Sequence, residues 1–149
     1  MRNAERMIWS DMEVYYTYLP SVLIYGEFSR AAVKDTAYLK TFAGTDQRYT
    51  KYTCRVAIIE LPFFLAAHAY SHVKGFPADG KTATYSRGIM LAGLFYFWMA
   101  SLVLYRYERR YTTVNIVCIT LGCIVLGTNL FYYTFYQPGM SHVYSFFFV

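Results

Sequence analysis

The sequence predicts an all-α membrane protein with three transmembrane helices, an amphipathic helical N-terminal segment and an aromatic C-terminal tail. Only 15% of its 149 residues are charged and 56% are hydrophobic, whereas an ordinary soluble domain has roughly 25% charged residues. Basic residues bracket two largely apolar segments that approach the length of about 20 residues needed to cross a bilayer as a helix. After Arg110 the sequence carries no full charge.

The N-terminal segment, residues 1–54, contains most of the charge. Residues 27–42 place apolar side chains near one helical stripe and basic side chains elsewhere, which predicts an amphipathic surface helix. Residues 14–25 are apolar, but they number twelve and contain a central Pro20, so they are too short to cross a bilayer. We expect them to lie at the membrane interface or under a partner, with a buried loop as the alternative.

The membrane domain, residues 55–137, begins with an expected span at residues 56–73. Four residues lower the hydropathy of this span: Glu60, Pro62, His68 and His72. Because proline lacks a backbone donor, we expect Pro62 to kink the helix or to mark its first turn. Residues 88–105 and 114–136 are uncharged, and we expect each to form one further span.

The distribution of basic residues predicts the orientation. With three spans, eleven Lys and Arg residues fall on the side shared by the N-terminal segment and the second loop, against three on the other side. Since positive charge accumulates on the inner side of membranes, the N-terminus is expected inside. The tail, residues 138–149, is then outside, and its aromatic residues are expected to pack on a partner or among lipid headgroups.

The third expected span carries a stripe of small and polar residues at intervals of three and four. The stripe consists of Asn115, Cys118, Gly122, Val125 and Asn129. Lipid gives no hydrophobic drive for helices to associate, so close backbone approach and interhelical hydrogen bonds are the expected adhesive features. We therefore predict that this stripe packs against protein, and Gly88 and Ala92 of the second span are candidates for part of its complement.

Two histidines and one carboxylate are the residues most suited to chemistry. His68 and His72 are four residues apart on one helical face, a spacing that can offer two nitrogens to one metal, and His142 would lie on the same side of the membrane. We favour hydrogen-bonded interfacial histidines and predict neither a metal site nor a catalytic residue. For Glu60 we favour a structural ion pair at headgroup level over a proton relay.

Other motifs restrict the function further. The sequence contains neither GxxxxGK[ST] nor GxGxxG, so no phosphate-binding loop is indicated. Its three cysteines lack CxxC spacing, which disfavours a disulfide framework or a zinc site. Acidic residues interrupt the start of the chain, and we therefore expect no cleavable secretory signal.

In this general organisation the chain resembles the small, basic, aromatic-rich supernumerary subunits of mitochondrial oxidative-phosphorylation complexes. The resemblance implies a non-catalytic accessory subunit, structural or for assembly, of a respiratory-chain complex or ATP synthase. It places the chain in the mitochondrial inner membrane with its N-terminus on the matrix side. Its partners would be other membrane subunits and membrane lipids, and bound phospholipid would be compatible with this role. The resemblance implies neither a cofactor nor a nucleic-acid partner.

Two alternatives remain open. The first is a membrane anchor that contributes to a haem or quinone site, as in succinate dehydrogenase, with His68 or His72 as the candidate ligands. A bis-histidine haem takes one ligand from each of two helices, and the second and third expected spans contain no histidine, so a partner would have to supply it. The second alternative is a small transporter, which the lack of a visible inverted repeat disfavours.

Overall fold

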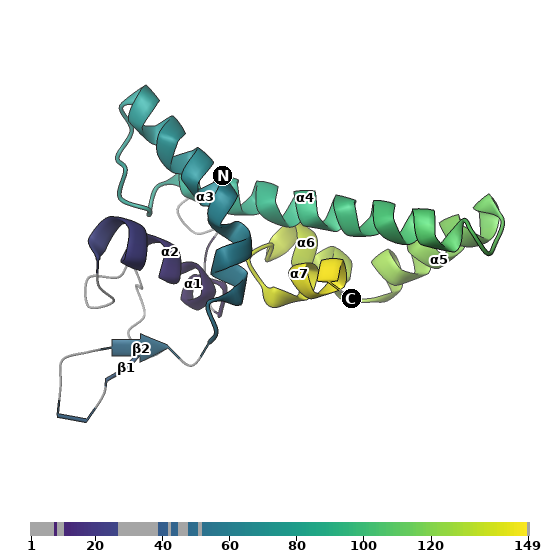
Figure 1. Ribbon diagram of the computed structural model, residues 1–149, viewed down its shortest axis with the longest axis horizontal. Coiled ribbons are helices and arrows are strands. Elements are labelled where there is room, and N and C mark those ends of the chain that lie inside the picture. The colour runs from purple at the N-terminus through teal and green to yellow at the C-terminus, as the bar shows by residue number, and fades with distance from the viewer. Residues whose placement is uncertain are drawn as a thin grey trace.

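The structure is a computed structural model, and it describes residues 8, 11–26, 39–41, 43–44, 48–50 and 52–148. Its helices are α1 (Asp11–Tyr16), α2 (Tyr18–Pro20), the π-helical turn η2 (Ser21–Tyr25), α3 (Arg55–Lys74), α4 (Ala83–Glu108), α5 (Val114–Gly127), α6 (Leu130–Tyr136) and α7 (Ser141–Phe148). A broad end contains α1 to α3 and the start of α4, while the rest of α4 extends with α5 as a long arm (Figure 1). Helices α6 and α7 lie beside the middle of α4 (Figure 1).

The apolar segment at residues 14–25 is helical and packs inside the chain. It forms the last part of α1, then α2 and η2, and it contributes Tyr16 and Leu19 to the principal buried cluster. The other members come from α3 and α4: Ala57, Phe64, Ala67, Tyr85 and Ile89. The segment therefore packs against α3 of its own chain, and short helices take the place of the buried loop that was the alternative.

The predicted amphipathic helix at residues 27–42 is wrong at its C-terminal end. Residues 39–41 form a strand, β1 (Leu39–Thr41), which pairs antiparallel with β2 (Arg48–Thr50). Tyr49 and Thr50 favour a strand, and Gly44 has a φ of 82°, a conformation that glycine adopts at no steric cost in a tight turn. Residues 27–38 lie outside the described residues.

Among the residues that the structure describes, two helices are long and apolar enough to cross a membrane, α3 and α4. Both lie where the charge pattern predicts a span, and α3 continues as one helix through Pro62. Helix α4 has 26 residues and is longer than its predicted span. At 1.5 Å per residue it measures ~39 Å, which exceeds the hydrocarbon thickness of about 30 Å.

The predicted third span is interrupted. Helices α5 and α6 meet at an angle of 66° and provide a third crossing only if the bent pair counts as one span. Thr128 lies at the break, where its side-chain oxygen donates to the carbonyl of Ile124 at 2.7 Å and accepts the Leu130 N–H at 3.2 Å. Threonine side chains that bond the local backbone in this way compete with helix continuation.

The C-terminal aromatic residues form α7, which folds back onto helices of its own chain, whereas the sequence predicted that they pack on a partner or among lipid headgroups. Val143 and Tyr144 are buried, while the Phe148 side chain is 65% exposed. The preceding turn reaches α4 at Gly93, where an added Cβ would lie 2.5 Å from the Cβ of Pro138. Glycine at this position therefore permits the close approach that brings α7 beside α4.

Candidate functional site

A buried carboxyl group, Glu60, lies where α1, α3 and α7 meet. Glu60 is on α3 and has no exposed surface. Its Oε1 accepts a hydrogen bond of 2.8 Å from the Tyr144 hydroxyl of α7, 84 residues away in sequence. Burial raises the pKa of Tyr144 well above its usual value, with Glu60 adding to the effect, so the hydroxyl remains protonated and donates.

Glu60 has only one of its two oxygens satisfied. Its Oε2 is buried and has no hydrogen-bond partner among the described residues. Its observed partner is the phenol of Tyr144, so the predicted ion pair is not found in the part of the chain that the structure describes. A buried polar group that is only half satisfied is uncommon and typical of a functional or strained position.

The turn before α7 closes over this carboxyl group. The backbone N–H of Gly139 points to the sulfur of Met12 in α1, with 3.1 Å between the two atoms. A Cβ on Gly139 would lie 2.4 Å from the Cγ of Met12 and 3.3 Å from Oε1 of Glu60. A side chain at Gly139 would therefore displace the Met12 side chain and crowd Glu60, and glycine lets the turn lie against both α1 and α3.

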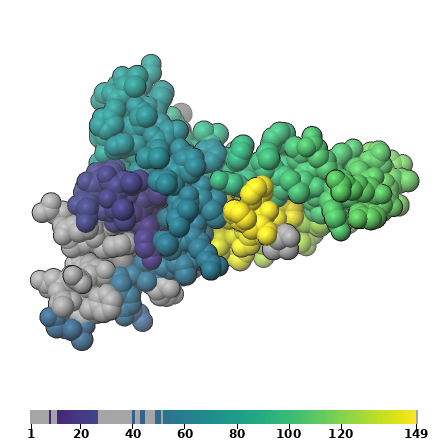
Figure 2. Space-filling view, viewed as in Figure 1, coloured from purple at the N-terminus to yellow at the C-terminus, as the bar shows by residue number. Residues whose placement is uncertain are grey.

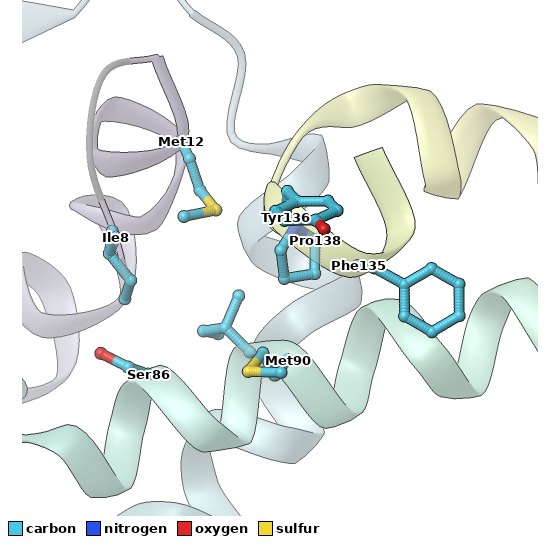
Figure 3. Close-up of a pocket in the computed structure, with 8 residues that line it drawn as sticks. Ile8, Met12, Ser86, Met90, Phe135, Tyr136 and Pro138 are labelled. Carbon is cyan, nitrogen blue, oxygen red and sulfur yellow. The ribbon is translucent and has the colours of Figure 1, made fainter. Parts of the chain in front are cut away.

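A small cavity of about 20 Å³ lies next to this turn. Met12 from α1, Ser86 and Met90 from α4, and Pro138 surround it (Figure 3). Its volume is close to that of a single water probe, and its walls are mostly apolar. The cavity is too small for an organic ligand, and we regard it as a packing gap between α1, α4 and the turn.

A second set of polar side chains, centred on His68, lies further along α3. His68 Nδ1 is 2.6 Å from the Tyr85 hydroxyl of α4, and His68 Nε2 is 3.2 Å from Nε2 of His72. Tyr16 lies on the same side of α3, and its hydroxyl donates to the carbonyl of Gly80 at 2.6 Å. Burial raises the pKa of Tyr16 above its usual value, which keeps this donor protonated.

The two histidines therefore form a short hydrogen-bonded chain. Each imidazole nitrogen in the chain is a donor or an acceptor according to the tautomer, and either assignment joins Tyr85, His68 and His72. His142 is stacked on Tyr133, with 4.1 Å between the ring centroids. In the described ranges no group of three or more His, Cys, Asp or Glu residues is suited to hold a metal ion.

The predicted packing stripe lies on the outside of the chain. It follows α5 and ends at the bend between α5 and α6. Asn115, Cys118 and Asn129 are exposed, and Gly122 and Val125 are half-buried. An added Cβ on Gly122 would meet no atom within 4 Å. Gly88, expected to face this stripe, instead packs against α3, where its Cβ would lie 3.1 Å from the Cβ of Ala67.

Sequence reasoning missed the residues that surround Glu60. Met12, Gly139 and Tyr144 are far from α3 in sequence, and no helical periodicity relates them to Glu60. The one available signal was a carboxylate inside an apolar segment, which needs a buried partner.

Comparisons with known proteins find no matching family model, no similar curated protein and no similar solved structure.

Proposed function

We propose that this chain is a non-catalytic accessory subunit of a multisubunit membrane complex. The observation that carries the proposal is the unpartnered outer face of α5, a helix that buries only Val117 among its 14 residues. On this face, exposed Asn115 and Cys118 alternate with large apolar residues such as Ile119, whose side chain is 66% exposed. An asparagine that faces lipid is costly, so a neighbouring protein is the better cover for this face.

The membrane setting follows from the composition of the helices. The Trp98 and Leu126 side chains are 61% and 75% exposed. Exposing such large apolar side chains to water costs free energy, whereas contact with lipid does not. In the proposed topology α3, α4 and the bent pair of α5 and α6 each cross the membrane. The Arg-rich end of α4 and the start of α3 then lie on the same, inner side.

The apolar segment at residues 14–25 runs along α3 in this topology, since Tyr18 bonds Tyr52 before α3 and Tyr25 bonds Asp79 after it. Helix α7 folds back from the outer side into the bundle, where Tyr144 reaches Glu60.

We further propose that the complex belongs to the respiratory chain or is ATP synthase, in the mitochondrial inner membrane with the N-terminus in the matrix. The support is the general organisation described above: a small basic chain, rich in aromatic residues, with several apolar helices. Positive charge on the inner side favours the matrix orientation. The buried Glu60 has a hydrogen-bonding role between α3 and α7 in this proposal.

The proposal is tested by solubilising the native membrane in a mild detergent and separating its complexes on a native gel. Mass spectrometry of the co-migrating chains should place this chain in a large respiratory or ATP-synthase assembly. An absorbance spectrum of the same band records whether haem is present. A small particle that contains only this chain would refute the proposal, and a small particle with a haem spectrum would support the anchor alternative.

A further inference from the structure

A groove of about 520 Å³ lies between the N-terminal half of α3 and one face of α7. In the space-filling view, α7 in yellow lies directly against the teal surface of α3 (Figure 2). Ser141, Ser145 and Phe148 follow one another at intervals of four and three residues and line the groove from α7. A volume of this size is within the range of sites that hold organic ligands.

The groove is amphipathic. Arg55, the first residue of α3, is exposed and is the only residue with a full charge among the described residues that line it. Hydroxyl groups of Thr53 and of two α7 serines line the same groove as this guanidinium, and apolar walls come from Val56 and Ile59. An arginine beside hydroxyl groups binds the oxygens of a phosphate well, because its planar donors match their geometry.

A second groove of about 190 Å³ lies on the other side of Ile58. Ile58 lines both grooves, and its side chain is 62% exposed, so it forms a ridge between them. The walls of the second groove are largely apolar and include Leu19, Val22 and Leu61. Two apolar channels that flank one ridge, next to a single cation, match a ligand with two hydrocarbon chains and one anionic headgroup.

We propose that these paired grooves bind one anionic phospholipid. Its phosphate contacts Arg55 and the neighbouring hydroxyl groups, and its two acyl chains lie on either side of Ile58. The inference rests on the proposed membrane insertion of α3, which places its first residue at the level of the headgroups. Basic pockets beside transmembrane helices on the inner side of a membrane are suited to anionic headgroups.

The test uses the full chain, purified and reconstituted in nanodiscs that contain equal amounts of phosphatidylglycerol and phosphatidylcholine. Native mass spectrometry after release from the nanodisc should detect one retained phosphatidylglycerol in preference to phosphatidylcholine. Arg55→Gln should reduce this retention by about tenfold or more, because a charge-assisted hydrogen bond is lost. Ser145→Phe, which fills the larger groove, should reduce retention of both lipids.

Arg106→Gln is the matched control, because Arg106 is also an exposed arginine, in the last turn of α4 and outside both grooves, and its replacement should leave retention unchanged. Equal retention of the two lipids, or an Arg55→Gln protein that retains phosphatidylglycerol normally, would overturn the proposal. Crosslinking of a partner protein within the groove, with no retained lipid, would also overturn it. A chain that retains phosphatidylglycerol but migrates alone on a native gel would sustain the lipid site and refute the accessory-subunit proposal.

Discussion

The two ends of the molecule differ in how completely their side chains are covered. At the broad end, Met12, Phe64 and Tyr85 are each 1% exposed, and segments from three parts of the sequence enclose them. Along the arm formed by α4 and α5, large apolar side chains such as Ile119 and Leu126 are exposed. Figure 2 shows this arm extending away from the broad end. The broad end therefore has a core that the chain itself encloses, whereas in the proposed membrane setting the apolar side chains of the arm would be covered by lipid and neighbouring helices.

Matched truncations should give the largest contrast between these regions. Phe64→Ala should lower the free energy of unfolding by about 3–5 kcal/mol, because it leaves a cavity among buried aromatic rings. Ile119→Ala on α5 should change it by less than about 0.5 kcal/mol, since its side chain is exposed. Unfolding of the detergent-solubilised chain by SDS titration measures both. Equal losses would contradict the comparison.

Adding one methyl group should give the next largest contrast. Gly93→Ala places a Cβ 2.5 Å from Pro138, and the expected destabilisation is about 1–3 kcal/mol because a proline ring and backbone must move. Gly122→Ala meets open space in the isolated chain and should be neutral or slightly stabilising, since alanine favours helix. The same titration tests both variants, and a neutral Gly93→Ala would show that the turn before α7 does not approach α4 so closely.

Removing the donor to Glu60 tests the polar contact within the broad end. Tyr144→Phe leaves a buried carboxyl oxygen without its partner and should cost about 1–3 kcal/mol. Tyr107→Phe is the control on the arm, because Tyr107 is 58% exposed, and it should cost little. Thermal unfolding of the two variants in the same detergent separates them. A Tyr144→Phe protein as stable as the control would mean that this contact contributes nothing.

The histidine pair should give the smallest effect. The combined change His68→Ala and His72→Ala removes the partner of the Tyr85 hydroxyl and should lower stability by about 0.5–1.5 kcal/mol. Activity and the absorbance spectrum of the assembled complex should remain nearly unchanged. Both are measured on the purified complex, and a loss of haem absorbance or of electron transfer would instead favour a role in a haem or quinone site.

The sequence predicted α3 and α4 well because charged residues bracket both. An uninterrupted apolar run fills most of α4, and α3 stays apolar enough despite Glu60 and Pro62. It also placed α5 and α6, but it missed their bend, which lies where the Thr128 side chain bonds the local backbone. The fold-back of α7 was missed for a different reason. The contacts that hold it, Glu60 with Tyr144 and Gly93 with Pro138, join residues far apart in sequence, and periodicity carries no information about such pairs.

In the candidate site, too, contacts between residues close in sequence could be predicted, whereas contacts between residues far apart could not. His68 and His72 were recognisable as neighbours because a helix brings residues four apart onto one face. Tyr85, the buried partner of His68, could not be assigned, since the crossing of α3 and α4 determines which tyrosine reaches it. The stripe on α5 is visible in sequence as a pattern, and in the isolated chain its outer face has no protein neighbour at Gly122, so its packing partner stays a prediction.

The most direct test of the account is whether the outer face of α5 holds the chain in a larger complex. Gly122→Leu should abolish co-migration with a large membrane assembly on a native gel, because the added side chain blocks close helix approach, while the stability of the isolated chain stays unchanged. Ile116→Leu, at an exposed apolar position of the same helix, should assemble normally. Normal assembly of the Gly122→Leu protein would contradict the central claim that a neighbouring protein packs against this face.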